Sequence, residues 1–325
     1  MRGRRRFLAR TLAALAALPL AAAHGARGFK LGWLSSGAGR SEAYNAAFTE
    51  RLRELGFVEG RNLVVEFRTA QGNIERLPVL AADLARANCD VLFAPGPETT
   101  LIAHRQASRD TPIVFAANDY DPVARGHIES LAKPGGRITG VTQAAAPLAR
   151  KRLEVLREIV PRATRIAVLV DIASENQLPE AALAARELGL TLVVHRFAAT
   201  PYDYDAAFDD FARNRAEAIL MLSSGLFVPA RTRIPELAIR HRLPGVYNNQ
   251  LWAESGGLVS YGSNFIDTYR RAADKVAAIF NGRKPADIPV EQPSAVEMVV
   301  NLRPAKTLGV TIPGSIRARA YRLID

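Results

Sequence analysis

FKLGWL at residues 29–34 is followed by SSGAGR at 35–40 and by SEAYNAAFTERLREL at 41–55. The first run is short, apolar and partly aromatic, which predicts a buried β-strand. In the last run apolar side chains recur every three or four positions from Tyr44 to Leu55, which predicts a helix with one buried face. A strand, a polar loop and a helix in this order form the repeating unit of a parallel sheet that is covered by helices.

The same unit recurs along most of the chain. Further strands are expected at 63–67, 91–94, 112–116, 165–170, 190–195, 218–222 and 245–247, with helices at 74–87, 98–108, 148–160, 178–188, 204–214 and 229–240. The series restarts after Gly140-Val141-Thr142. Two series in one chain predict an α/β protein with two similar lobes, each built on a parallel sheet.

The last part of the chain departs from this rhythm. A helix is expected at 265–280, a proline-punctuated extended segment at 285–293 and one more strand at 296–300. Inserted back into the first lobe, such a segment would make the chain cross between the lobes more than once. We expect an N-terminal lobe of residues 29–142 plus about 262–290 and a C-terminal lobe of residues 143–261 plus about 291–325, joined by a hinge of several segments.

Residues 1–23 have the features of an export signal. Five arginines and no acid surround the start of an apolar segment from Thr11 to Leu20, and Ala21-Ala22-Ala23 offers the small residues that a signal peptidase needs. Arg4-Arg5-Arg6-Phe7-Leu8 also fits a twin-arginine pattern, and the general secretory route is the alternative. A membrane anchor is disfavoured because a span needs about 20 apolar residues. We therefore expect cleavage near Ala23 and a protein that works in the periplasm.

The positive charge of the chain is scattered. The 325 residues include 43 Lys and Arg and 32 Asp and Glu, a net charge of +11. Five of the positive charges lie in residues 1–23, so the remainder carries +6, and it has no long basic run. A nucleic-acid partner is therefore not expected. The remainder is long enough for two lobes that each bury a core.

Motifs for catalysis or metal binding are missing from the sequence. The one cysteine, Cys89, precedes the apolar run 91–94, so we expect it to be a small buried residue and not a nucleophile. No G-x-S-x-G motif occurs. The histidines stand far apart, at His24, His104, His127, His195 and His241. Without a metal-ligand spacing they are expected at the surface or at helix caps, and we expect no metal and no cofactor.

The loop at 35–40 has part of a dinucleotide-binding fingerprint, because Gly37 and Gly39 follow a strand and precede a helix. The position of the third glycine is taken by Glu42, whose carboxylate would repel a pyrophosphate. We therefore interpret the loop as one whose hydroxyls and backbone N–H groups face a cleft. At a helix N-terminus such donors suit a carboxylate or another anionic group of a ligand.

Polar residues gather at the C-terminal ends of the predicted parallel strands, where open α/β sheets bind ligands. The candidate ligand-binding residues are Ser35, Ser36, Glu98, Thr99, Asn118, Asp119 and Asp121 in the first series and Ser174, Asn176, Ser223, Ser224 and Asn248 in the second. For any one of them the alternative is a helix cap. As a set they indicate a binding site, because two facing lobes would aim both groups at one crevice.

Aromatic residues lie close to these loops in the sequence, at Tyr44, Tyr120, Phe227, Tyr247 and Trp252. Such side chains stack on apolar or aromatic parts of ligands. Packing in the core is the alternative, and for Tyr44 and Tyr247 it is equally plausible.

Several stretches resemble one known family, in order along the chain. They are LRELGFVEG at 52–60, DPV at 121–123, SLAKPGG at 130–136, KRLE at 151–154, GGLVSYG at 256–262, KPADIPVEQP at 284–293, NL at 301–302, AK at 305–306 and LGVTIP at 308–313. The chain thereby resembles the substrate-binding proteins of ABC importers, in the branch of tryptophan- and tyrosine-type binding proteins. The cleft loops at 118–120, 174–177 and 223–227 depart from the pattern, so the resemblance leaves the ligand open.

The resemblance implies a type I periplasmic-binding fold, with two Rossmann-like lobes that close on a ligand around a three-segment hinge. It also implies a membrane permease and its ATPase as partners. Our hypothesis is a monomeric, non-enzymatic solute-binding protein for an amino acid or a related carboxylate. Ser35, Ser36 and Ser174 would hold the carboxylate, and Glu98, Asp119 or Asp121 would hold an amine. The alternatives are a binding partner of a sensor kinase and an exported hydrolase or lyase, because a fold alone does not separate these functions.

Overall fold

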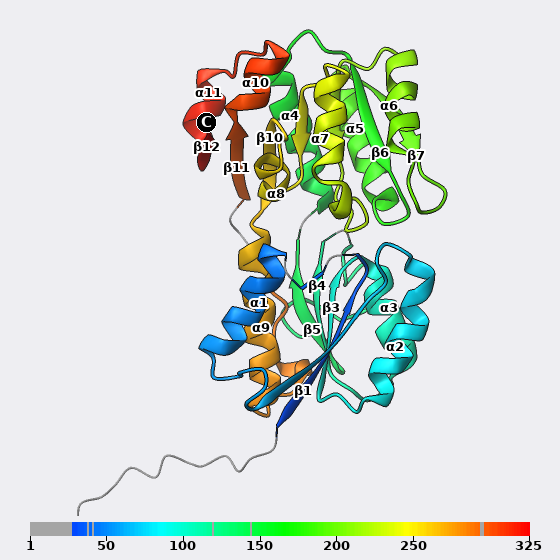
Figure 1. Cartoon of the computed structure of the whole chain (residues 1–325), viewed down its shortest axis with the longest axis vertical. Helices are drawn as coiled ribbons and strands as arrows, with labels where there is room; N and C mark the ends of the chain where they lie inside the picture. Colours follow the sequence, from blue (N-terminus) through cyan, green and yellow to red (C-terminus); the bar gives the residue numbers. More distant parts are fainter. Residues whose placement is uncertain (1–27, 38, 41, 119, 144, 293–295) are drawn as a thin grey trace, which may run out of the picture.

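The computed structural model describes residues 28–325 apart from 38, 41, 119, 144 and 293–295. The export signal expected at 1–23 and the candidate residue Asp119 therefore lie outside the described residues. Two α/β lobes are stacked along the long axis of the molecule (Figure 1). The predicted fold class, two lobes with mostly parallel sheets, is confirmed.

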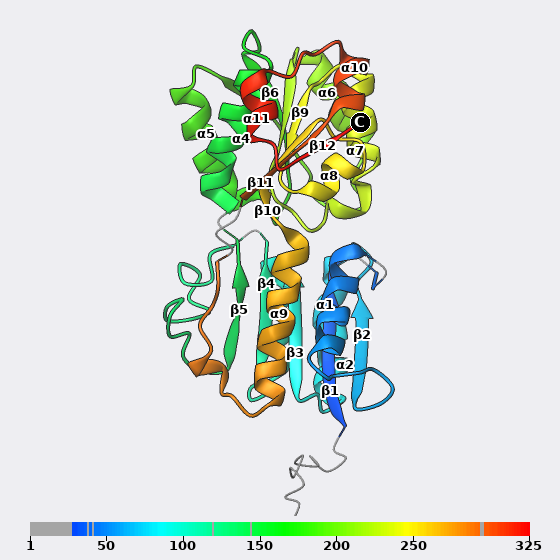
Figure 2. The same cartoon turned by 90° about the vertical axis from the view of Figure 1, so that its left-hand side faces the viewer.

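The N-terminal lobe is built on a parallel sheet with the strand order β2-β1-β3-β4-β5. Its strands are β1 (Phe29–Ser35), β2 (Leu63–Thr69), β3 (Val91–Gly96), β4 (Ile113–Ala117) and β5 (Ile138–Thr142). One face is covered by α1 (Ala43–Glu54) and α9 (Phe265–Phe280), and the other by α2 (Leu77–Arg86) and α3 (Glu98–Ala107) (Figure 2). The short 3₁₀ helices η1 (Ile74–Arg76) and η4 (Pro285–Asp287) complete the lobe.

The C-terminal lobe has a sheet of seven strands in the order β12-β11-β10-β9-β8-β6-β7. Its strands are β6 (Arg165–Val170), β7 (Thr191–Arg196), β8 (Ala218–Met221), β9 (Gly245–Tyr247), β10 (Val259–Ser263), β11 (Val296–Asn301) and β12 (Arg322–Ile324). Its helices are α4 (Ala145–Ile159), η2 (Glu175–Gln177), α5 (Leu178–Glu187), α6 (Tyr204–Arg213), η3 (Val228–Ala230), α7 (Arg233–Arg240), α8 (Gln250–Glu254), α10 (Leu302–Leu308) and α11 (Gly314–Arg319). The β10–β11 pair is antiparallel, and the other neighbours in this sheet run parallel.

The chain passes between the two sheets three times, from β5 to α4, from β10 to α9 and from η4 to β11. Before the third passage Glu291 still belongs to the first sheet, because its N–H donates to the carbonyl oxygen of Gly140 at 3.2 Å. Helix α9, drawn in orange, lies beside α1, drawn in blue, although the two are far apart in the sequence (Figures 1 and 2). A late segment of the chain thus completes the first lobe.

An aromatic cluster fixes α1 and α9 on this face of the sheet. The side chain of Trp33, on β1, is 1% exposed and lies with its ring centroid 4.9 Å from that of Phe48 on α1. Phe48 stacks on Phe93 of β3 at 4.2 Å, and Phe93 meets the edge of Tyr269 on α9 at 6.0 Å. Each such aromatic pair adds about 0.5–1.5 kcal/mol beyond the burial of its area, so the cluster holds the two helices firmly.

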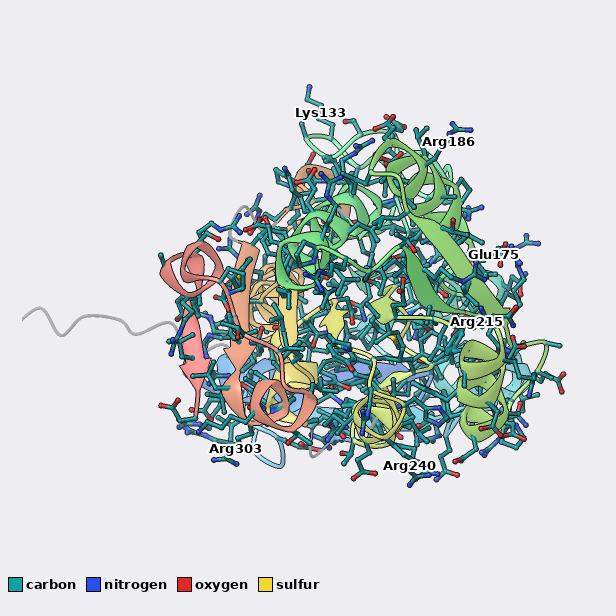
Figure 3. The ribbon with its side chains drawn as sticks, turned by 90° about the horizontal axis from the view of Figure 1, so that it is seen from above. Lys133, Glu175, Arg186, Arg215, Arg240 and Arg303 are labelled. Carbon is teal, nitrogen blue, oxygen red and sulfur yellow. The ribbon has the colours of Figure 1, made fainter. Side chains whose placement is uncertain are left out.

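Charged side chains are spread over the outer surface. Lys133, Glu175, Arg186, Arg215, Arg240 and Arg303 are exposed and lie towards the rim of the molecule in Figure 3. Many of the charged side chains form local ion pairs. In one of these, Nη2 of Arg233 lies 2.7 Å from Oδ1 of Asp205. Within the described residues, every helix is too short or too polar to cross a membrane.

Some short elements were not predicted from the sequence. Strands β5, β10 and β12 and helices α8, α10 and α11 are absent from the predicted series. Each is short, and β5 and β10 contain a glycine that interrupts the apolar pattern, so tertiary pairing forms them where local preference is weak. The expectation for Cys89 is confirmed, since it is buried and desolvation raises the pKa of its thiol to about 11.

The expectation that the histidines lie at the surface or at caps is wrong for His104. Its side chain is fully buried in α3, and its Nε2 lies 3.3 Å from the carbonyl oxygen of Phe93. Burial lowers the pKa of His104 to about 4, because a charged imidazolium loses its hydration there.

Acid is therefore expected to destabilise the fold through His104. The unfolded chain takes up a proton on this side chain near its ordinary value of 6.5, whereas the folded chain resists it down to about pH 4. The stabilisation is complete above pH 6.5 and is lost as the pH falls, by about 2 kcal/mol between pH 7 and pH 5. Urea unfolding of the wild type and of a His104→Gln variant at both pH values measures it. The variant should lose this part of the pH dependence, and a His241→Gln control should keep it; equal pH dependence in all three would contradict the assignment.

Candidate ligand-binding site

The site lies where the two sheets point their C-terminal strand ends at each other. Ser35 ends β1, Ser36 follows it, and Asn118 follows β4 in the N-terminal lobe, while Gly225 lies in the loop after β8 in the C-terminal lobe. A Cβ atom placed on Gly225 would lie 3.1 Å from Cδ of Pro97 and 3.7 Å from Oγ of Ser36. The loops of the two lobes are therefore in direct contact, and a larger residue than glycine has little room at this position.

Two pockets are lined by residues of both lobes, and in one of them Asn73, Ile74 and Glu75 face Ile172 and the loop after β7. The other, the interlobe pocket, lies at the strand ends. Its lining residues are Ser35, Ser36, Tyr44, Asn45, Pro95, Gly96, Asn118, Gly225, Val228, Phe265 and Tyr269. All of these are uncharged, and the aromatic ones form one wall, with Tyr44 and Tyr269 4.8 Å apart and Tyr44 and Phe265 6.0 Å apart between ring centroids. Aromatic rings and hydrogen-bonding groups thus line the same space. In this arrangement of the lobes the space is about 20 Å³, which is room for about one water molecule, so a ligand with a ring needs the lobes to move apart.

Asn118 is the polar residue of this pocket with an unused hydrogen-bond acceptor. Its side chain is 4% exposed, and its Oδ1 is buried with no hydrogen-bond partner among the described residues. A buried oxygen without a donor costs about 1–3 kcal/mol, and proteins rarely leave one unpaired without a functional reason. This oxygen can accept a hydrogen bond from an N–H or ammonium group of a ligand.

The C-terminal lobe has a similar group at Asn248, after β9. Its Nδ2 donates to Oγ of Ser223 at 3.2 Å, and its Oδ1 has no partner among the described residues. Ser223 is itself held through its backbone, because its N–H donates to Oε1 of Gln177 at 2.9 Å and its carbonyl accepts from Nε2 of Gln177 at 2.7 Å. Asn248 is therefore presented by a rigid support.

Ser174 and Ser224 belong to a network around Asp171. The Ser224 hydroxyl donates to Oδ2 of Asp171 at 2.6 Å, and the Ser174 hydroxyl donates to Oδ1 at 2.8 Å. The hydroxyl of Tyr202 approaches Oδ2 at 3.3 Å. Burial raises the pKa of Asp171, although these hydrogen bonds act in the opposite direction. Both serines are engaged in shaping the loops after β6 and β8.

Glu98 and Thr99 lie outside the lining of the interlobe pocket. Glu98 accepts a hydrogen bond from Nε2 of His127 at 2.7 Å and lies 3.5 Å from Nε of Arg125. Its carboxylate is thus paired within the N-terminal lobe. Thr99 contributes to a separate surface pocket, between α2 and α3.

Asp121 and Asn176 are exposed and also lie outside the lining of the interlobe pocket. Oδ1 of Asp121 accepts hydrogen bonds from the backbone N–H groups of Val123 and Ala124, at 2.9 and 3.1 Å. Asp121 therefore caps a turn, whereas the alternative considered from the sequence was a helix cap.

Of the aromatic residues considered from the sequence, Tyr44 packs in the core of the N-terminal lobe and also lines the pocket. Phe227, Tyr247 and Trp252 pack in the core of the C-terminal lobe, and Tyr120 packs in that of the N-terminal lobe. Sequence reasoning missed Asn45, Phe265 and Tyr269. The last two are four residues apart, on one face of α9, but only tertiary contact shows that this face meets α1.

Sequence reasoning also missed Arg152, a buried cation. Its side chain is 1% exposed, Nε donates to the carbonyl oxygen of Tyr261 at 2.8 Å, and Nη1 has no partner among the described residues. Burial lowers the pKa of Arg152 to about 9, so it still carries its charge at neutral pH. A Cβ atom on Gly262 would lie 3.6 Å from Nη2 and also against the backbone of Asn248. The positive charge therefore lies at the ends of β9 and β10, next to Asn248.

Among the residues that the structure describes, no three His, Cys, Asp or Glu side chains meet in a way that could hold a metal ion. The loop after β1 carries Glu42 beside the first turn of α1, as the sequence indicated. The interlobe pocket offers hydrogen bonding and aromatic contact, and the buried charge of Arg152 lies outside its lining.

Two facing α/β lobes with mostly parallel sheets and three connecting passages are the architecture of the type I periplasmic binding proteins. The chain belongs to the ABC transporter substrate binding protein family, whose model matches residues 35–324. The family resemblance seen in the sequence is thereby confirmed. Members of this family are solute-binding proteins, not enzymes, in agreement with the expectation from the sequence.

Individual relatives agree with this assignment. A tyrosine-binding protein of Clostridioides difficile is 23% identical over 264 residues, which cover 80% of this chain and 75% of that protein. A conserved domain protein of Vibrio cholerae has a TM-score of 0.83 and 26% identity, covering 91% of this chain and 100% of the other. An ABC domain of Streptococcus pneumonia in complex with L-Trp has a TM-score of 0.82 and 22% identity, with the same coverage. ABC substrate-binding proteins in general work outside the cytoplasm.

Proposed function

We propose that this protein is the exported binding component of an ABC importer and that it holds an aromatic amino acid between its lobes. The observation that carries this proposal is the pocket with an aromatic wall of Tyr44, Phe265 and Tyr269 and the unpaired amide oxygen of Asn118. The relatives that bind tyrosine and L-Trp support it independently.

Each part of such a ligand has a matching group. The ring would lie against Tyr44 and Tyr269, where stacking and edge contacts are favourable. The ammonium group would donate to Oδ1 of Asn118, with Oδ1 of Asn248 as a second acceptor. The carboxylate would accept from the loop of Ser35 and Ser36 at the start of α1.

Ligand capture is proposed to close the two lobes. The three passages, near 143–144, at Asn264 and between Glu291 and Val296, would form the hinge between an N-terminal lobe of 29–142 plus about 262–290 and a C-terminal lobe of 143–261 plus about 291–325. Only a closed state contacts the ligand from both lobes, so binding shifts the population towards it. The membrane permease and its ATPase would then receive the closed, loaded protein.

Export is proposed on the basis of residues 1–23. Their arginines, apolar segment and small residues fit a signal that is cleaved near Ala23, and they fit the twin-arginine route as well as the general one. The working protein would then be a monomer in the periplasm.

Thermal unfolding of the purified protein with single amino acids tests the binding role. L-tryptophan or L-tyrosine at 100 times its dissociation constant should stabilise the fold by about 2.7 kcal/mol, which raises the melting temperature by several degrees. L-alanine is the matched control, because it has both charged groups but no ring. A shift with sugars or nucleosides instead would refute an amino-acid ligand, and chemical turnover of a bound compound would refute the binding-only role.

A further inference from the structure

One ion pair joins the two lobes. Nη1 of Arg231, just after η3 in the C-terminal lobe, lies 3.1 Å from Oε1 of Glu42, just before α1 in the N-terminal lobe. In the described part of the chain, the other ion pairs each connect groups of a single lobe. The pair therefore reports on how the lobes face each other.

The pair lies beside the interlobe pocket. Glu42 is two residues before Tyr44, and Nη1 of Arg231 also lies 3.5 Å from the carbonyl oxygen of Val228; Tyr44 and Val228 both line the pocket. The charges of both residues act on the Tyr44 hydroxyl, whose pKa is raised mainly by burial. The ion pair therefore lies next to the same pocket residues, Tyr44 and Val228, that would contact the proposed ligand.

The loops that carry the pair also meet directly. A Cβ atom on Gly37 would lie 3.5 Å from Cγ of Pro229, which places the loop after β1 against η3. Neither loop belongs to the three passages between the sheets. No covalent connection therefore keeps Glu42 and Arg231 together, and the pair separates when the lobes move apart.

The exposure of the pair suits a reversible contact. The side chains are 22% and 31% exposed, so both charges keep part of their hydration when the pair forms. A fully buried pair would lose more in desolvation, and a fully exposed one would be screened by salt. A contact of this kind changes an equilibrium constant about two- to fivefold, which is enough to bias an open–closed equilibrium.

We propose that Glu42 and Arg231 form a latch between the lobes. They act as positioning residues, because their ion pair stabilises the closed state and thereby slows ligand release. The inference rests on the proposed function, because it needs a ligand held in the interlobe cleft. It also gives a role to the acidic residue that replaces the third glycine of a dinucleotide fingerprint. The carboxylate of Glu42 pairs with Arg231 of the opposite lobe.

Stopped-flow binding of L-tryptophan to four variants tests the latch. Glu42→Gln and Arg231→Gln should each raise the dissociation rate constant about two- to fivefold, with little change in the association rate constant. The double variant Glu42→Arg/Arg231→Glu should recover most of the loss, because the pair is rebuilt with its charges exchanged. Arg233→Gln is the matched control, since Arg233 pairs with Asp205 inside one lobe and lies two residues from Arg231.

The outcomes separate the latch from the binding role. If the wild type binds and both single variants release the ligand at the wild-type rate, the latch is refuted. If the wild type binds no aromatic amino acid, the proposed ligand class is wrong, and the distance between spin labels on the two lobes decides the latch. Without ligand, Glu42→Arg should then be more open than the charge-exchanged double variant, and equal distance distributions would refute the latch.

Discussion

An Asn118→Leu variant is expected to lose about 10- to 100-fold in affinity for its ligand while its stability stays equal or rises. In the free protein Oδ1 of Asn118 is buried without a donor, so the oxygen costs free energy until a ligand supplies one. Leucine has nearly the same shape and removes this cost. The bound state, however, loses a hydrogen bond to a charged donor, which contributes about 1.5–3 kcal/mol.

Isothermal titration calorimetry with L-tryptophan measures the affinity, and thermal unfolding without ligand measures the stability. Asn281→Leu is the matched control, because Asn281 is exposed at the far end of α9 and should bind as the wild type does. An unchanged dissociation constant in Asn118→Leu would remove Asn118 from the site. A large drop in the melting temperature would indicate instead that Asn118 has a structural partner.

A Gly262→Ala variant is expected to destabilise the C-terminal lobe by about 3 kcal/mol or more. A Cβ atom at this position would lie 1.8 Å from the backbone oxygen of Asn248 and 2.8 Å from its carbonyl carbon. Both are main-chain atoms, so no side chain can turn aside to make room. Strand β10 would have to move away from the end of β9, and Asn248 would move with it.

Chemical unfolding of the two variants Gly262→Ala and Gly314→Ala measures this effect. Gly314 begins α11 and has no atom within 4 Å of the added methyl group, so its variant should stay within about 0.5 kcal/mol of the wild type. A Gly262→Ala protein as stable as its control would mean that the β9–β10 contact is looser than described here. Lost ligand affinity should accompany the lost stability, because Asn248 is a proposed ligand contact.

Much of the architecture follows from the spacing of apolar residues. Runs such as 91–94 and 165–170 are long and apolar enough to be recognised as buried strands, and alternation with helices implies a parallel sheet. Strand β10, Val259–Ser263, was missed because it contains Gly262 and two serines and has no apolar run of its own. Pairing with β9 and β11 makes it a strand.

The site could be predicted in part because polar residues at the ends of the predicted strands can be read from the sequence. The rule that ligands bind at the C-terminal ends of parallel strands selects Ser35, Ser36 and Asn118, and these three residues line one pocket in the structure. The same rule also selects Asp121, whose carboxylate turns back to its own backbone, because Asp is favoured equally at turns. Tyr269 could not be placed from the sequence, since its position depends on the packing of α9 against α1.

The packing of α9 against α1 also affects when the N-terminal lobe can fold during translation. The core around Trp33 needs the side chains of α9, so the lobe that leaves the ribosome first is completed only after residue 280 has been made. Contacts between segments so distant in sequence form slowly, because a long loop must be closed first. Until then α1 alone covers this face of the sheet, and part of the face stays apolar and exposed. The N-terminal lobe therefore reaches its native state only after the segment that contains α9 has been translated, and the chain can be kept unfolded until then.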